Sequence, residues 1–488
     1  MIETVEIDEP VGLDEYAEVG HLSAAVRALR EQASGLVSAL SGRKVWMVNS
    51  TARGGGVAEM LPKLVAMLRE LGVDVEWLVM GSEEAAFFDL TQRLHNLIHG
   101  VGDLGLTDED QRLYAAVSSA NASELKQRLG RDDILVVHDP QPLGMGALLK
   151  RELGLPFVFR CHIGLDQDRP ETRAAWNFLR PYADECDHAV FTAPQYIPPY
   201  LAGRSGLISP AIDPLGYKNR ELSPHKLAGI LKSSGLACSR HPVVPKRVRE
   251  PAMRLMPGGE FAAMTEETDI GIPFRPVVAQ ISRWDRLKGY EPVLEGFVHL
   301  KRSIGRREVS ERHRRHLANV RLVLAGPDPA AVADDPEARD VLENLTGSYQ
   351  ELAPWLQEDV AIVTLPMGSR ENNALMVNAL QRCASVVVQN SIQEGFGLTV
   401  TEAMWKQRGV LGSQACGIRQ QIRDGMDGHL LSDSRDPREI AERLDAMLDD
   451  LDGRSRLGQS AQRRVHDEFL VFTQARRWLE TLAELARG

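Results

Sequence analysis

The sequence predicts an α/β protein with two main domains, each built on a parallel β-sheet that helices cover on both faces. The first observation is its length, because 488 residues are enough for two or three domains with separate cores. The second is that short, continuously apolar runs alternate with helical patterns, which is typical of buried parallel strands joined by helices. The third is that this alternation becomes irregular over residues 232–275 and then restarts at Pro276.

The first array follows a short extended start and a helix expected from His21 to about Leu40. A buried strand over Lys44–Asn49 leads through a glycine-containing turn into a helix that ends at Gly72. The remaining strands expected in this array are Val75–Met80, Ile134–His138, Phe157–His162, His188–Thr192 and Leu207–Ser209.

The second array begins with a strand over Pro276–Ile281. Two successive arrays of this kind indicate two Rossmann-like domains facing a central cleft. The remaining strands expected in the second array are Val320–Ala325, Val360–Leu365, Ser385–Gln389, Val410–Gly412 and His429–Leu431.

The domain boundaries follow from these arrays. The Rossmann-like domains are expected over residues 41–225 and 276–468, and the other segments are an N-terminal extension with a helix (1–40), an irregular linker or insertion (226–275) and a C-terminal helix (469–488). The insertion holds a basic, proline-rich stretch, His241–Arg247, for which a solvated loop is the simplest interpretation. A second basic segment, Lys301–Arg315, is expected to be an exposed helix.

Composition excludes several classes of protein. The net charge of −11 leaves no basic excess to neutralise nucleic-acid phosphates. The five cysteines are odd in number and form no CxxC pair, which favours reduced thiols in the cytoplasm over a disulfide framework. The first residues are acidic, unlike a signal peptide, and no apolar run approaches the roughly eighteen residues that span a bilayer. We therefore expect a cytoplasmic protein without nucleic-acid or membrane partners.

Two motifs carry the expected chemistry. Gln393–Ala403 places Glu394 and Glu402 on either side of a glycine-bounded turn that opens a helix, and Ser282–Gly289 supplies Arg283 and Lys288 just after a strand. Glycines let a backbone approach a ligand, amides at a helix start face an anion, and an Arg with a Lys can hold a diphosphate. Each feature also has a structural explanation: an exposed charged pair, a plain turn, or a carboxylate that complements a helix dipole. Together they predict a sugar-nucleotide site.

Several segments in order along residues 44–430 resemble the retaining glycosyltransferases of the GT-B fold. Within that group, which includes glycogen synthase-like and sucrose synthase-like enzymes, the chain looks most like the trehalose glycosyltransferring synthases and the retaining trehalose phosphorylases. The matching segments are Asn49–Glu59, His138–Leu143, Arg160–Ile163, Ser209–Leu215, Gln280–Asp285 and Val388–Lys406. The chain departs from these relatives at Gly164, where they usually carry an Asp, and Asp166 follows two residues later. Its insertion before Pro276 is also longer than expected.

The resemblance implies a role for each matching residue. It assigns catalytic roles to Arg283, Lys288, Glu394 and His162, and donor binding to Gly55, Gly56, Gly395, Phe396, Gly397, Leu398 and Glu402. His138 and Asp139 end another strand and are candidate acceptor ligands, and Asp166 is a further candidate. The matching glutamate and histidine of the family contact the transferred glucose near its 3-hydroxyl and 6-hydroxyl. Asp139 precedes a proline, so an extended backbone is expected there.

The implied reaction is front-face transfer of glucose from a nucleoside diphosphate glucose to free glucose, with retention, giving α,α-trehalose. No Asp-x-Asp motif stands at a convincing strand end, so neither a metal nor another cofactor is expected. The alternatives are a retaining trehalose phosphorylase, a transferase for another sugar acceptor, and a non-catalytic regulator that binds a sugar nucleotide. Homodimers are common among such enzymes, and the insertion could contribute to one.

Overall fold

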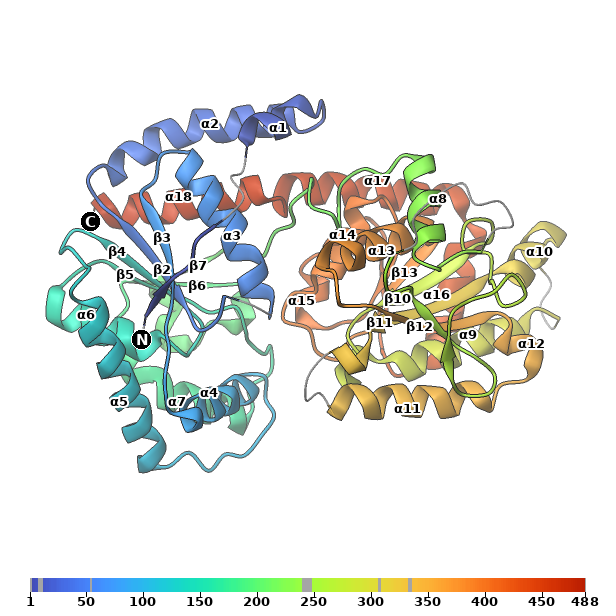
Figure 1. The fold of residues 1–488 in the computed structure, drawn as a ribbon, viewed down its shortest axis with the longest axis horizontal. Coiled ribbons are helices and arrows are strands. Elements are labelled where there is room, and N and C mark those ends of the chain that lie inside the picture. The colour runs from blue at the N-terminus through green and yellow to red at the C-terminus, as the bar shows by residue number, and fades with distance from the viewer. Residues whose placement is uncertain are drawn as a thin grey trace. The chain divides into compact units, whose positions relative to one another are not determined.

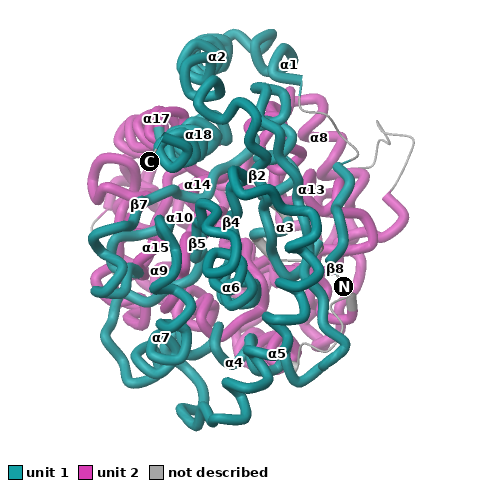
Figure 2. Tube along the Cα trace, turned by 90° about the vertical axis from the view of Figure 1, so that its left-hand side faces the viewer, with its two compact units in different colours: residues 1–213, 468–488 teal, residues 214–467 magenta. Residues whose placement is uncertain are grey.

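The fold is that of a computed structural model, which describes residues 2–7, 12–52, 55–238, 248–305, 309–331 and 336–487. The chain forms two compact units (Figure 2). Unit 1 comprises Met1–Asp213 and Glu468–Gly488, and unit 2 comprises Pro214–Asp467. The chain therefore passes from one unit to the other twice. The basic stretch His241–Arg247 lies outside the described residues.

Unit 1 is built on a seven-stranded sheet in the order β1-β3-β2-β4-β5-β6-β7, parallel except for β1 at the edge. Its central strands are short apolar runs, and every residue of β2 and β4 is buried. The strands are β1 (Glu3–Thr4), β2 (Val45–Asn49), β3 (Val75–Val79), β4 (Ile134–His138), β5 (Phe157–Arg160), β6 (His188–Phe191) and β7 (Ser205–Leu207).

Helices that are far apart in the sequence pack together in unit 1. The helix α18 contacts both α2 and α3 (Figure 1), and its Trp478 is buried. Just before α18, Leu470 forms a parallel bridge with Ile212, so the two segments that connect to unit 2 lie side by side. The helices of unit 1 are α1 (Leu13–Glu18), α2 (Ser23–Val37), α3 (Gly55–Glu70), α4 (Ala85–Ile98), α5 (Asp108–Leu125), α6 (Leu143–Leu153), α7 (Pro170–Ala183) and α18 (Val471–Arg487), with short 3-10 helices η1 (Ser38–Leu40), η2 (Pro194–Tyr196) and η3 (Pro199–Arg204).

Unit 2 has an eight-stranded sheet in the order β15-β14-β13-β10-β11-β12-β8-β9. Its six strands from β15 to β12 are parallel, whereas β8 and β9 add an antiparallel edge. That edge comes from the stretch expected to be irregular. The strands are β8 (Met253–Leu255), β9 (Phe261–Ala262), β10 (Val277–Ile281), β11 (Arg321–Pro327), β12 (Val360–Leu365), β13 (Val386–Gln389), β14 (Gly409–Gly412) and β15 (His429–Leu430).

The expected exposed helix over Lys301–Arg315 is wrong. Helix α9 ends at Ser303 and a separate helix, α10, begins at Glu311. Lys301 is buried and its Nζ lies 2.7 Å from Asp359 Oδ2. The helices of unit 2 are α8 (Pro224–Ser233), α9 (Tyr290–Ser303), α10 (Glu311–Asn319), α11 (Pro336–Gln350), α12 (Pro354–Gln357), α13 (Arg370–Cys383), α14 (Leu398–Trp405), α15 (Cys416–Arg419), α16 (Pro437–Asp449) and α17 (Leu451–Glu468), with short 3-10 helices η4 (Arg286–Lys288) and η5 (Pro329–Ala331).

Each sheet has a point at which the direction of winding reverses. In unit 1 the chain runs from β2 to β3 on one side and then returns to β4 on the other. In unit 2 it runs from β10 through β11 to β12 and then returns to β13. Open α/β sheets bind ligands at the carboxyl ends of the strands beside such a reversal. Among the described residues, no helix is both long and apolar enough to cross a membrane.

Candidate active site

The first cluster of predicted residues lies at the reversal of unit 2. Strands β10 and β13 pair in parallel, with Val278 opposite Val386 and Ala279 opposite Val387. Their carboxyl ends therefore meet at one edge of the sheet. The segment after β10 carries Arg283 and Lys288, and the segment after β13 carries Glu394. The sheet thus brings together two motifs that are about a hundred residues apart in the sequence.

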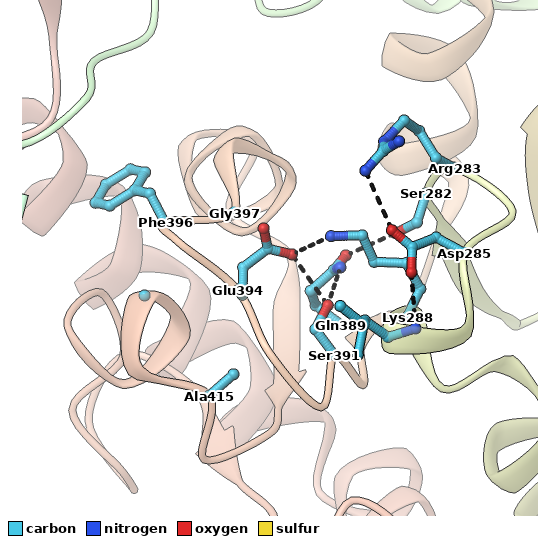
Figure 3. Close-up of polar contacts among 12 residues, drawn as sticks. Ser282, Arg283, Asp285, Lys288, Gln389, Ser391, Glu394, Phe396, Gly397 and Ala415 are labelled. Carbon is cyan, nitrogen blue, oxygen red and sulfur yellow. Dashed lines mark hydrogen bonds and ion pairs between the residues drawn. The ribbon is translucent and has the colours of Figure 1, made fainter. Parts of the chain in front are cut away.

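Lys288 and Glu394 form the centre of this cluster (Figure 3). Lys288 Nζ lies 2.6 Å from Glu394 Oε2, and the two side chains are only 13% and 14% exposed. Ser391 Oγ donates a second hydrogen bond to the same carboxylate oxygen, at 3.0 Å. The carboxylate is therefore held in one orientation by a charged and a neutral donor.

A chain of hydrogen bonds continues from Glu394 to the other motif. Gln389 Nε2 donates to Ser391 Oγ at 2.9 Å, and Ser282 Oγ donates to Gln389 Oε1 at 3.2 Å (Figure 3). Both Gln389 and Ser391 are buried. These two residues were not among the expected site residues, although polar residues at the end of an apolar strand are a visible signal in the sequence.

Two further hydrogen bonds, one from a side chain and one between main chains, fix the same two segments against each other. Asn390 Nδ2 donates to the carbonyl of Gly289 at 3.0 Å, and the carbonyl of Leu287 accepts from the N–H of Ile392 at 2.7 Å. Gly289 has a φ of 60°, and a Cβ there would lie 2.5 Å from Asn390 O. Glycine is required at this position by both its backbone conformation and its close neighbour.

Arg283 has a different environment from Lys288. Its side chain is 69% exposed, and its Nη2 lies 3.1 Å from Asp285 Oδ2. Asp285 in turn caps the short helix η4, because its Oδ1 accepts from the N–H of Leu287 at 2.8 Å. The Asp285 carboxylate thus orients the Arg283 guanidinium, and the guanidinium stays accessible to solvent.

Helix α15 packs against the backbone of the glycine-bounded turn. Gly397 has a φ of 84° and is the N-cap of α14, which begins at Leu398. A Cβ on Gly417 would lie 2.4 Å from Phe396 Cα, and the Gly417 N–H donates to the Glu394 carbonyl at 3.0 Å. The turn of Glu394 to Gly397, which includes Gly395, therefore rests directly on the backbone of α15.

Glu402 lies on α14, the helix that the glycine-bounded turn opens, as expected. It lies in the second turn of α14, so it is too far along the helix to complement the dipole at its start, and that interpretation is wrong. Its side chain is buried, with Lys218 Nζ 4.0 Å from Oε1. The carbonyl of Glu402 accepts from Lys406 Nζ at 3.0 Å, and burial lowers the pKa of Lys406 to about 7.

A second cluster lies at the reversal of unit 1. Gly55 and Gly56 are the first residues of α3, which follows β2, whereas Gly54 lies outside the described residues. His138 is the last residue of the neighbouring strand β4, and Asp139 follows it. Strand β5 ends at Arg160, so His162 lies in the loop beyond it rather than in the strand as expected.

The two histidines of this cluster face each other. His138 Nδ1 lies 3.0 Å from His162 Nε2, and the rings are nearly parallel, with centroids 5.3 Å apart and an interplanar angle of 14°. The N–H of His162 donates to Asp139 Oδ1 at 2.7 Å. The ring and the main chain of His162 are therefore each held by one residue of the His138–Asp139 pair.

The extended backbone expected for Asp139 is wrong. Its φ is 66°, in the left-handed region, although Pro140 follows. The N–H of Asp139 donates to the carbonyl of Arg160 at 2.7 Å, and its side chain accepts from His162. These two bonds hold a conformation that Asp tolerates better than most residues and that otherwise carries strain.

Burial sets the protonation of this cluster. It lowers the pKa of His138 to about 3 and that of His162 well below its usual value, and the nearby Arg160 guanidinium lowers both further. Burial also raises the pKa of Asp139 to about 6, against the opposing effects of the His162 N–H and Arg160. Arg160 is itself buried, and its Nη2 donates to the carbonyl of Ile208 at 2.8 Å. Both imidazoles are thus neutral at pH 7.

The departure at Gly164 has a clear steric reason. A Cβ at this position would lie 2.2 Å from Tyr196 Cγ, so the aromatic ring occupies the space that a larger residue at this position would need. Tyr196 is buried in η2. Asp166 is half-buried in the same loop, between β5 and α7.

Comparison with known proteins agrees with this arrangement. A family profile described as "Trehalose synthase, N-terminal domain" matches residues 47–198, and one described as "Glycosyl transferases group 1" matches residues 270–464. The solved structure entitled "Trehalose-6-phosphate from E. coli bound with UDP-2-fluoro glucose" has a TM-score of 0.63 at 15% identity, over 91% of this chain and 99% of that one. The chain is a glycosyltransferase with the GT-B fold, which confirms the fold class expected from the sequence.

Relatives identified by sequence similarity place the chain in a particular family of glycosyltransferases. A trehalose synthase of Pyrococcus horikoshii is 33% identical over 448 residues, which are 91% of each chain. A trehalose phosphorylase of Pleurotus sajor-caju is 24% identical over 471 residues, which are 91% of this chain and 58% of that protein. The chain belongs to the trehalose synthase family.

Proposed function

We propose that this glycosyltransferase moves glucose from a nucleoside diphosphate glucose to free glucose and forms α,α-trehalose with retention. The observation that carries the proposal is the buried contact between Lys288 and Glu394 at the reversal of unit 2. It combines a cation for a phosphate with a carboxylate for sugar hydroxyls at the place where α/β sheets bind ligands. Family membership supports trehalose as the product.

Unit 2 would bind the donor. Arg283 and Lys288 would hold the diphosphate and stabilise the charge that grows on it as the bond to the glucose C1 breaks. The amides of Gly395, Phe396, Gly397 and Leu398 would bond the sugar or a phosphate at the start of α14. Glu394 would accept a hydroxyl of the glucose, and Glu402 would accept the ribose hydroxyls.

Residues of unit 1 would bind the acceptor and part of the transferred sugar. His162 would contact the 6-hydroxyl of the transferred glucose, and His138, Asp139 and Asp166 would lie beside the acceptor. Gly55 and Gly56 would leave room for the diphosphate. The acceptor oxygen bonds to C1, and its proton passes to the departing diphosphate oxygen. The cations of the protein neutralise the diphosphate, so we propose that no metal or other cofactor is required.

Phosphorolysis of trehalose is the second candidate, because the same cations suit a phosphate and a trehalose phosphorylase is among the relatives. Both reactions need a sugar and a phosphate but no macromolecule, and the net charge of −11 is consistent with that. The five cysteines, all within the described residues, form no disulfide bond, which supports our proposal that the protein acts in the cytoplasm. We also propose that a homodimer is one form of the enzyme, which sedimentation would test.

Product analysis by NMR separates these reactions. The purified protein would be incubated with glucose and ADP-, UDP- or GDP-glucose, each with and without EDTA, and a parallel sample would hold trehalose and phosphate. Trehalose from a nucleotide sugar in the presence of EDTA supports the proposal and names the base. Glucose 1-phosphate in the phosphate sample alone would establish the phosphorylase instead. No product in any sample would contradict both.

A further inference from the structure

We propose that His138 is a positioning residue that fixes the proton of His162 on Nδ1, so that His162 presents a neutral N–H donor to the substrate. This inference deepens the proposed function, because the substrate contact of His162 rests on it. The geometry of the two rings is independent of the proposed function. His138 Nδ1 and His162 Nε2 are 3.0 Å apart, and the other nitrogen of each ring is buried without a hydrogen-bond partner among the described residues.

Only one of the two facing nitrogens can carry the shared proton. If His138 Nδ1 carries it, His138 donates, and the proton of His162 must sit on Nδ1. If His162 Nε2 carries it, His138 accepts, and the proton of His138 must sit on its Nε2. The first arrangement leaves an unpaired N–H on His162, and the second leaves one on His138.

Burial decides between these arrangements. His138 is 2% exposed, and the ring of Trp478 lies against it with centroids 6.1 Å apart. An N–H in that setting would have no partner at any stage, which is rare in proteins, whereas an unpaired lone pair is better tolerated. His162 is only partly buried. His162 Nδ1 is itself covered in the ligand-free protein, so an N–H there is satisfied by a sugar hydroxyl once the substrate displaces the atoms that cover it.

The surrounding groups keep the pair neutral. The titratable groups beside the two rings are Arg160, Asp139 and Cys161, and the Arg160 guanidinium opposes protonation of both histidines. The Asp139 side chain, carried on a strained left-handed backbone, accepts from the His162 N–H and so fixes the main chain from which the His162 ring extends. A neutral donor whose direction is fixed before the substrate binds is what positioning of a reacting sugar requires.

The direct test reads the position of the proton without activity. The full chain would be prepared with 15N-labelled histidine, and two-bond 1H–15N correlations of the imidazoles would be recorded from pH 5.5 to 8, with His162→Gln to assign the His162 signals. We expect the pattern of an Nδ1–H neutral ring for His162 throughout this range. An Nε2–H pattern, or a charged ring at pH 6, would overturn the inference.

The kinetic test compares two replacements of His138. In His138→Asn the amide nitrogen lies where Nδ1 lay and can still donate, whereas His138→Leu fills the space without a donor. We expect His138→Leu to lower kcat about 100-fold and His138→Asn to retain most of it. Equal losses in the two variants would mean that His138 acts by shape alone and would refute its role as donor.

A matched control is His188→Leu, because His188 begins β6, which pairs with β5, and so lies at the sheet edge opposite to the histidine pair. Its kcat should stay within about twofold of the wild-type value, as is usual away from a functional site. If the wild type transfers no glucose from any donor, the proposed function fails, and the NMR pattern alone still decides where the His162 proton lies.

Discussion

Lys288 Nζ lies 2.6 Å from Glu394 Oε2, so the cation proposed for the diphosphate and the carboxylate proposed for the glucose are bonded to each other in the ligand-free protein. In the proposed function, a bound donor would draw Lys288 toward its phosphates and leave Glu394 to the sugar. The free enzyme thus keeps two mostly buried charges compensated until the donor replaces the contact.

Replacing Glu394 by Gln should abolish transfer and leave the fold intact. The amide keeps the shape of the carboxylate but loses the charge that accepts sugar hydroxyls and orients Lys288. We expect a loss in kcat of at least about 100-fold, measured by product NMR, with an unchanged circular dichroism spectrum. Glu295→Gln, on the exposed face of α9, is the control. Near-normal turnover in Glu394→Gln would contradict the assigned role.

Replacing Arg283 by Gln should impair catalysis without affecting stability. Its side chain is 69% exposed and paired only at the surface, so the free energy of unfolding should change by less than about 0.5 kcal/mol. Loss of charge stabilisation on the diphosphate should lower kcat about 100-fold. Arg286→Gln is a close control, because Arg286 is 65% exposed and pairs with Asp340 at 3.2 Å. Equal activities of the two variants would show that Arg283 does not act on the diphosphate.

Replacing Gly417 by Ala should displace the turn that carries Glu394. The new Cβ would meet the backbone of Phe396 at 2.4 Å, so we expect a loss of about 1–3 kcal/mol in urea unfolding together with reduced kcat. Gly347→Ala in α11 has no atom within 4 Å of its Cβ and should stabilise the protein by about 0.5–1 kcal/mol. The steric argument fails if both variants unfold at the same urea concentration as the wild type.

Asp139→Asn should change how stability depends on pH. The pKa of Asp139 is raised from 3.8 to about 6 in the folded protein, so between these values the folded chain holds a proton that the unfolded chain has released. This term favours folding below about pH 4 and is lost as pH rises through 6, a difference of about 3 kcal/mol. The variant lacks the term, so its stability relative to the wild type should increase from pH 4 to pH 7. Denaturant unfolding at each pH measures this.

The exposed Asp132→Asn serves as the control for that experiment, and its stability relative to the wild type should be the same at every pH. If Asp139→Asn behaves in the same way as this control, the Asp139 carboxyl is not perturbed by burial. The amide can still accept from the His162 N–H, so a loss of activity without a loss of stability would point to acceptor binding by the carboxylate.

The long apolar strands were the most predictable part of the fold. Val360–Leu365 was expected with the bounds that the structure gives it, because continuous burial leaves a continuous apolar run. Strands β8 and β9 were not expected, because strands of two or three residues at a sheet edge leave no periodic pattern. The buried Lys301 was misread because its partner, Asp359, is distant in the sequence.

Open α/β sheets bind ligands at the carboxyl ends of their strands, and this rule made part of the candidate site predictable. The parts of the site whose geometry depends on contacts between residues distant in the sequence were not predictable. The rule placed Lys288 at the carboxyl end of a strand, and the structure joins it to Glu394, which was expected just before a helix. It gave no indication that Gly417 supports the turn, because that requirement comes from a distant backbone atom. The left-handed Asp139 was also hidden, because two hydrogen bonds outweigh the local preference set by Pro140.

Helix α18 completes unit 1, and its Trp478 lies against His138. The ribosome synthesises residues 214–467 before it reaches Trp478. A growing chain therefore contains all of unit 2 while the tryptophan that packs against His138 is still missing. Domains usually fold in the order of their synthesis. Here the half that is synthesised first is finished last, and the nascent protein acquires the unit proposed to bind the donor before its histidine pair is in place.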